Sequence, residues 1–115
     1  MVRIKFRYIG IKYSFDTLTR YSINNKTFLD IIINHIKIEH GEIGVSKLTD
    51  FQITDNYPNN NIILFRVGRD SKEIILKILN QIKVLNGKKC DFSILGVSGA
   101  IKNVKNKILK HLKNN

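Results

Sequence analysis

The chain has 115 residues, 43% of them hydrophobic, which suits one folded domain over residues 1–115 and excludes a disordered chain. No apolar run approaches the ~20 residues that a membrane helix needs. The first residues alternate between charged and apolar side chains, unlike a signal peptide. Cys90 is the only cysteine, which excludes an internal disulfide. The lack of a signal-peptide pattern leads us to expect a protein that is not secreted. Twenty Lys and Arg against nine Asp and Glu give a net charge of +11, so we expect an anionic partner.

The positive charge is concentrated towards the two ends of the chain. Residues 1–20 carry a net +4 and residues 88–115 a net +6, whereas the 67 residues between them contribute only +1. A fold that brings the two ends together would concentrate positive potential on one surface, which suits a phosphate backbone. The alternative interpretation is a basic surface that is merely solvated.

The first half of the chain begins with a predicted strand and a predicted helix. Residues 2–15 alternate between apolar and polar side chains, as in a β-strand. The apolar phase changes after Tyr8, beside Gly10, and a one-residue shift of this kind indicates a β-bulge or a bend. Residues 27–40 carry apolar side chains at helical spacing, and Gly41 is a natural end for that helix.

The middle of the chain predicts an antiparallel hairpin. Residues 45–57 alternate as a second strand, and residues 56–61 are rich in Asn and contain the only proline, which is typical of a turn. Residues 62–67 are apolar except for one arginine, as expected of an inner strand.

Three further elements follow the hairpin. Asp70 and Glu73 match a capping box at the start of a helix whose apolar stripe runs to Leu85. Residues 90–97 alternate as a fourth strand. Residues 100–113 form an amphipathic helix with its lysines facing outward.

The predicted order is β-α-β-β-α-β-α, an α+β protein. Its first six elements match the ferredoxin-like arrangement, a four-stranded antiparallel sheet with two helices on one face. The last helix must cap an end of the sheet, cover its open face or contact a partner.

A glycine-flanked serine precedes the last helix. The segment from Gly96 to Gly99 does not match the G-x-S-x-G nucleophile elbow, and no histidine–carboxylate pair is evident to activate Ser98. One interpretation is a turn in which Ser98 caps the helix. The other is an anion site, where backbone N–H groups approach a phosphate at the start of the helix.

Two arginines end the third predicted strand. Arg66 and Arg69 are placed to bind phosphate or, alternatively, to form ion pairs with Asp70 or Glu73. Residues 61–67 lack the aromatic pattern of an RNA-recognition motif. We therefore expect contacts with phosphates and RNA shape, rather than base stacking on the sheet.

Four segments together resemble the ribonuclease P protein component 2 family of archaea and its eukaryotic counterpart. They are residues 7–8, 40–44, 63–70 and 94–102, of which the last is the most specific. Ala100 departs from the family pattern, where threonine is expected. The lost hydroxyl would cost a cap or a phosphate contact and not the fold.

The resemblance implies a ferredoxin-like subunit of the ribonucleoprotein that removes 5′ leaders from precursor tRNA. In that family the RNA supplies the active site and its Mg²⁺, so no catalytic residue, metal or cofactor is expected on the protein. The implied partners are ribonuclease P RNA, precursor tRNA indirectly, and component 3, a TIM-barrel subunit, in a two-plus-two assembly through self-association, with no membrane. The implied location is the cytoplasm in an archaeon, or the nucleus or nucleolus in a eukaryote.

Charge and resemblance together predict a set of RNA-binding residues that come mostly from the two ends of the chain. They are Arg3, Lys5, Arg7, Arg66, Arg69, Lys88, Lys89, Ser98, Lys102 and Lys105.

Two other functions share the predicted fold. One is a small phosphate-ester or acyl-phosphate hydrolase, but residues 9–13 do not match the glycine-rich substrate loop of the acylphosphatases. The other is a ligand-sensing module, which would bind a small molecule and have no affinity for RNA.

Overall fold

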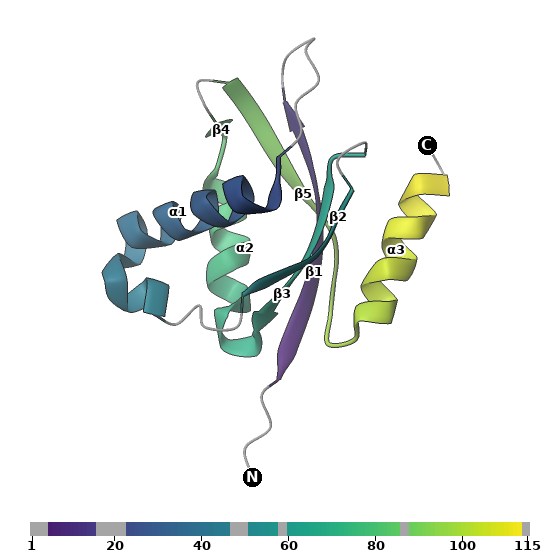
Figure 1. Cartoon of the computed structure of the whole chain (residues 1–115), viewed down its shortest axis with the longest axis horizontal. Helices are drawn as coiled ribbons and strands as arrows, with labels where there is room; N and C mark the ends of the chain where they lie inside the picture. The colour runs from purple at the N-terminus through teal and green to yellow at the C-terminus, as the bar shows by residue number, and fades with distance from the viewer. Residues whose placement is uncertain (1–4, 16–22, 47–50, 58–59, 86–87, 114–115) are drawn as a thin grey trace.

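The computed structural model describes residues 5–15, 23–57 without 47–50, 60–85 and 88–113 (Figure 1). In chain order the elements are β1 (Phe6–Phe15), α1 (Asn25–Ser46), β2 (Gln52–Tyr57), β3 (Ile62–Gly68), the 3₁₀ turn η1 (Arg69–Ser71), α2 (Lys72–Gln81), β4 (Val84–Leu85), β5 (Lys88–Ser98) and α3 (Ile101–Lys113). Within these residues, no helix combines the length and apolar character needed to cross a membrane.

The strands form one antiparallel sheet in the order β2-β3-β1-β5-β4. The first four positions follow the ferredoxin-like order, so the predicted α+β fold is confirmed. The fifth strand, β4, was not predicted. The helical stripe was wrongly extended to Leu85, because α2 ends at Gln81 and Ile82 is already extended, with φ −77° and ψ 111°. Val84 and Leu85 then pair with the start of β5.

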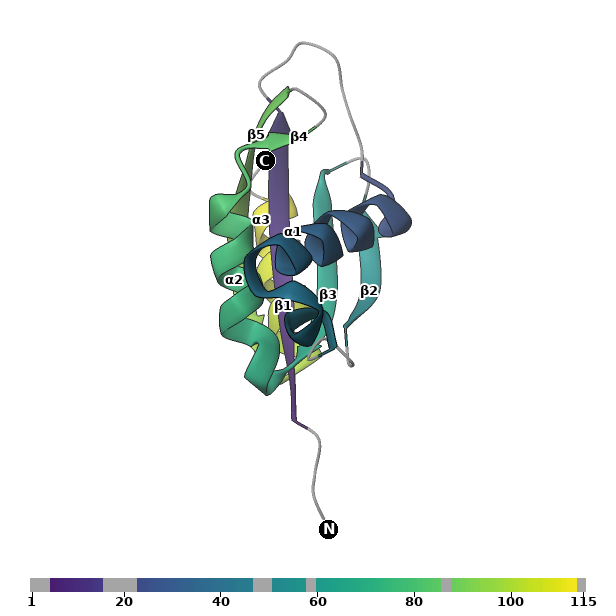
Figure 2. The ribbon, with the colours of Figure 1, turned by 90° about the vertical axis from the view of Figure 1, so that its left-hand side faces the viewer.

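Helices cover both faces of the sheet. Helices α1 and α2 lie on one face and α3 lies on the other, as the two views show (Figures 1 and 2). The main core lies under α1 and α2 and includes Phe28 and Phe65, whose rings meet edge to face with centroids 5.3 Å apart. A second cluster lies under α3, where Val104 and Ile108 pack with residues of β3. Of the three roles open to the last helix, the structure shows that it covers the open face.

The change of apolar phase in β1 reflects these two covered faces. Tyr8 packs in the cluster under α3, whereas Ile9, Ile11 and Tyr13 are fully buried in the main core. Because side chains alternate between the faces of a strand, an apolar side chain suits either parity once both faces are covered.

The register does shift beside Gly10, as predicted, but the prediction was wrong to place the bulge in the first strand, because the extra residue is on its partner β5. Strand β1 pairs with β3 in unbroken register. Its register with β5 shifts after Gly10. Gly10 pairs with Gly96, but the next residue, Ile11, pairs with Ile94, so Leu95 of β5 has no partner in β1. The bulge therefore belongs to β5, and β1 runs through it.

The predicted end of the first helix and the predicted start of the second helix need correction. Gly41 breaks the helical backbone, with φ 68° and ψ −167°, but α1 resumes and ends at Ser46, inside the predicted second strand. Helix α2 has Ser71 rather than Asp70 at its N-cap position, because the 3₁₀ turn η1 precedes it. The glycine acts as an interruption, and the predicted capping box does not define the start of α2.

Candidate nucleic-acid interface

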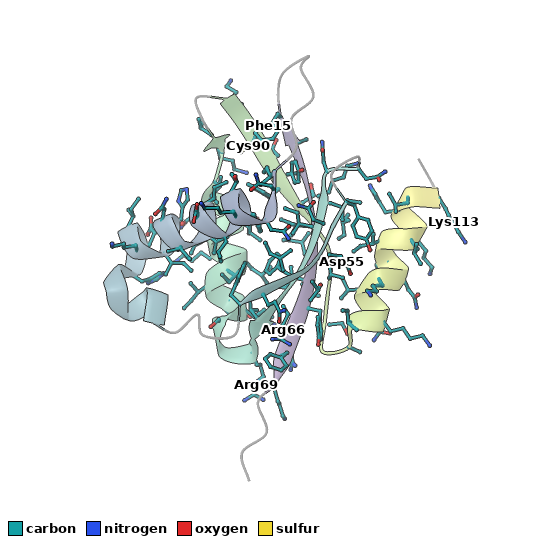
Figure 3. The ribbon with its side chains drawn as sticks, in the orientation of Figure 1. Phe15, Asp55, Arg66, Arg69, Cys90 and Lys113 are labelled. Carbon is teal, nitrogen blue, oxygen red and sulfur yellow. The ribbon has the colours of Figure 1, made fainter. Side chains whose placement is uncertain are left out.

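The sheet topology brings three segments of the chain to one end of the sheet. Strand β1 starts where β3 and β5 end, because it is antiparallel to both. Tyr8 consequently pairs with Arg66 on one side and with Ser98 on the other. Figure 3 shows Arg66 and Arg69 at this end, near the start of β1. We call this region the basic end and define it by Lys5, Arg7, Arg66, Arg69 and Lys102.

Arg66 is held against an aromatic ring at the basic end. Its guanidinium carbon lies 4.3 Å from the centroid of the Phe6 ring, a cation–π distance. Its Nε is buried and has no hydrogen-bond partner among the described residues. A stacked guanidinium keeps a fixed plane, and a fixed fork of N–H donors is the geometry that phosphate recognition uses.

The alternative that the two arginines form ion pairs with Asp70 or Glu73 stays open, because the Asp70 side chain lies outside the described residues and Glu73 has Lys72 beside it. The Glu73 carboxylate lies 3.3 Å from the Lys72 ammonium, and both belong to the first turn of α2. The backbone N–H of Arg69, in η1, donates to the carbonyl of Lys5, the residue before β1, at 2.9 Å. The side chain of Arg69 is exposed.

Arg7 lies beside the turn that leads into α3. Its Nη1 donates to the carbonyl oxygen of Phe6 at 2.9 Å. A Cβ placed on Gly99 would lie 3.2 Å from the same Nη1. Gly99 therefore leaves room for the guanidinium of Arg7, and this spatial role explains one of the two glycines that flank the serine.

Ser98 stabilises the turn before α3. Its Oγ accepts a hydrogen bond from the backbone N–H of Ala100 at 3.2 Å and another from the Asn103 side-chain amide at 3.3 Å. The motif is therefore a strand-to-helix turn, as one interpretation held, but Ser98 is not the N-cap residue, because α3 begins at Ile101 and Ala100 directly precedes it. A phosphate contact at this turn stays a prediction.

Two of the predicted residues lie at the opposite end of the sheet. Cys90 pairs with Phe15 at the far end of β1, and Figure 3 shows both well away from Arg66. Lys89 is exposed next to Cys90, so nine residues of extended strand, or about 30 Å, separate it from Ser98. Lys88 is at the same end by its strand position, although its side chain lies outside the described residues. The convergence of the two ends of the chain is therefore partial.

Three other predicted residues have different outcomes. Lys105 lies on α3 with its ammonium 3.6 Å from Oδ2 of Asp55 in β2, so a carboxylate partly balances its charge. Arg3 lies outside the described residues. Lys102, in the first turn of α3, is exposed.

Sequence reasoning missed a polar groove between β5 and α3. It has a volume of about 300 Å³ and is lined by Val97, Ser98, Asn103, Asn106, Lys107 and Lys110. The sequence indicates that these lysines face outward but not which strand they overlook, because that depends on how α3 lies on the sheet. The only signal was the spacing of Asn103, Lys107 and Lys110, which places them on one side of a helix.

The groups with shifted pKa lie away from the basic end. Burial raises the pKa of the Cys90 thiol, and the charge of Asp91 raises it further, against an opposing effect of Lys83. Burial also raises the pKa of Tyr13, whose hydroxyl accepts the backbone N–H of Ile23 at 2.8 Å. In the part of the chain that the structure describes, no three His, Cys, Asp or Glu side chains form a cluster that could hold a metal.

Fold and charge together define a basic, ferredoxin-like α+β protein with guanidinium groups gathered at one end of its sheet. The sequence model of the Rpp14/Pop5 family matches residues 7–109, from β1 into α3, and the chain belongs to this family of ribonuclease P protein subunits. The family expected from the four sequence segments is thereby confirmed.

Structural comparison agrees on the fold. A chain in a cryo-EM structure of yeast ribonuclease MRP is similar with a TM-score of 0.65, covering 99% of this chain and 93% of that chain at 13% sequence identity. No curated protein sequence matches the chain.

Proposed function

We propose that this subunit binds the RNA of a ribonuclease P-type ribonucleoprotein and holds it in the fold that removes 5′ leaders from precursor tRNA. The observation that supports the proposal is that Arg7, Arg66 and Arg69 of β1, β3 and η1 lie at one end of the sheet, where the register puts Arg7 and Arg66 on opposite faces. Membership of the family supplies the assembly in which such a surface would work. Catalysis and its Mg²⁺ would be supplied by the RNA, with the protein acting through binding.

The mechanism we propose is electrostatic. Phosphates brought close in a folded RNA repel one another, and cations placed between them lower the cost of that fold. Each phosphate that the protein neutralises should add about 0.7 to 0.9 to the slope of log affinity against log salt. Base stacking on the open face of the sheet is not part of the proposal, because α3 covers that face.

Protein partners form the second part of the proposal. The family resemblance suggests component 3 and a second copy of this chain, in the cytoplasm of an archaeon or the nucleus of a eukaryote. Large apolar side chains on two helices are available to such partners, since Ile38 of α1 is 79% exposed and Leu109 of α3 is 54% exposed.

Reconstituted leader cleavage tests the proposed function. The ribonuclease P RNA of the same organism is assayed with precursor tRNA at Mg²⁺ too low for the bare RNA, with the chain and its protein partners added. The complete mixture should cleave, and R7Q/R69Q should lower the rate at limiting protein. A matched pair, K26Q/K77Q, removes two exposed charges from α1 and α2 and should not. Equal rates with and without the chain would contradict the proposal.

A further inference from the structure

The groove between β5 and α3 is lined by groups that donate hydrogen bonds or carry positive charge. Lys107 and Lys110 lie on one wall, with Asn103 and Asn106 on the same helix. Within the described residues, neither lysine ammonium has a carboxylate within salt-bridge distance. The lining contains no acidic residue. This balance suits an anion and disfavours a cationic ligand.

The hydroxyl of Ser98 gives an independent indication of what the groove accepts. A serine oxygen has two lone pairs and one proton. Its two lone pairs are engaged by the Ala100 N–H and the Asn103 amide. The hydroxyl can therefore act towards the groove only as a donor, and its natural partner is an oxygen with lone pairs, such as that of a phosphate.

Gly96 positions one of the lysines. A Cβ on Gly96 would lie 2.7 Å from Cδ of Lys107, so the aliphatic stem of this lysine crosses β5 directly over the glycine. The stem is packed against the strand while the residue stays exposed overall. Lys107 is also one of the residues that line the groove.

We propose that this groove binds the sugar-phosphate backbone of an RNA strand, as a second contact site that adjoins the basic end at Ser98 and runs along α3. The proposal rests on the proposed RNA-binding function and names where a further strand would lie. From Asn103 to Lys110 the helix rises about 10 Å. That length matches about three nucleotides of a stacked strand, at about 3.4 Å per nucleotide. Because the lining offers amides, lysines and a hydroxyl but no aromatic ring, recognition would be of backbone and not of base identity.

The test measures affinity for the organism's own ribonuclease P RNA between 50 and 200 mM salt. K107Q/K110Q removes two phosphate contacts, so its salt slope should fall by about 1.4 to 1.8. Its loss of affinity over that salt range should then be about tenfold smaller than that of the wild type. K26Q/K77Q removes the same charge from the opposite face of the sheet and should leave the slope unchanged.

Ser98 provides a test that does not depend on charge. S98A should weaken binding by about tenfold, the usual effect of losing one hydrogen bond to a charged group. S98T keeps the hydroxyl and should restore affinity. Circular dichroism and thermal unfolding separate this effect from fraying of α3, since S98A also removes the contact with the Ala100 N–H.

The outcomes separate the groove from the function as a whole. If the wild type binds RNA and R7Q/R69Q weakens it, while K107Q/K110Q behaves like K26Q/K77Q, the groove proposal is wrong and the proposed function stands. If the lysine pair instead weakens binding to an acidic protein partner and leaves RNA affinity intact, the groove is a protein site and the proposal is overturned. If the wild type shows no salt-dependent binding to RNA, both the groove proposal and the proposed function are wrong.

Discussion

Gly10 of β1 and Gly96 of β5 pair directly opposite each other beneath α3. A Cβ on Gly10 would lie 3.0 Å from Cγ1 of Val104, and one on Gly96 would lie 2.7 Å from Cδ of Lys107. The missing side chains let the helix lie close to the sheet. The pair therefore determines both the packing of the second cluster and the position of a groove lysine.

The two glycines should differ in their tolerance of a side chain. Gly10→Val forces atoms against Val104 and Ile108, which are buried and cannot move away, so we expect a loss of about 1–3 kcal/mol in the free energy of unfolding. Gly96→Ala meets the middle of a flexible lysine side chain, so we expect a change within about 0.5 kcal/mol. Urea unfolding followed by circular dichroism measures both, and equal losses would contradict the assignment.

Helix α3 should be held on the sheet by few buried residues. Ile108 is 1% exposed, so Ile108→Ala should cost about 2–5 kcal/mol. Its neighbour Leu109 is 54% exposed, so Leu109→Ala serves as the matched control and should change stability by less than about 0.5 kcal/mol. The midpoint of thermal unfolding distinguishes them. A similar effect of the two variants would mean that α3 does not pack as described.

The stacked guanidinium of Arg66 should matter for its shape as well as its charge. Arg66→Lys keeps the charge but loses the planar fork and its stacking on Phe6. We expect weaker RNA binding with an unchanged salt slope, because the number of neutralised phosphates is the same. Filter binding at several salt concentrations measures both quantities. Wild-type affinity in Arg66→Lys would show that a point charge suffices there.

Stability should fall at alkaline pH because two buried acids resist ionisation. The pKa of Cys90 is raised from 9.0 and that of Tyr13 from 10.0, so the folded protein holds these protons more tightly than the unfolded chain. Their contribution is complete below the unfolded values and is lost as pH rises above about 9. Cys90→Val should remove the loss of stability that begins near pH 9, which is due to the thiol. It should leave the further loss near pH 10, which is due to Tyr13. Unfolding midpoints from pH 7 to 11 measure this, and a parallel decline in the variant would contradict it.

Local patterns predicted most of the fold, because each strand and helix has its own periodicity. The alternation of β1 and the apolar run of β3 gave strands with nearly the observed bounds. The end of α2 was missed because Val84 and Leu85 continue the helical stripe, and only pairing with β5 makes them a strand. Such pairing depends on a distant segment that no local window contains.

The candidate site was predicted less completely, for a geometric reason. Arg7, Arg66 and Ser98 are brought together by antiparallel pairing, which the ferredoxin-like order already implied. The same pairing sends Lys89 to the opposite end, because a strand separates its two ends by its full length. The groove at Lys107 depended on which face α3 covers, and the sequence left that choice open.

The most direct measurement is the salt dependence of RNA affinity for the wild type and for R7Q/R69Q. If guanidinium groups from separate segments share one phosphate-binding end, log affinity should fall steeply with log salt in the wild type. The slope of the variant should then be smaller by about 1.4 to 1.8. A wild-type affinity that is flat with salt, or an R7Q/R69Q slope equal to that of the wild type, would contradict the existence of this surface.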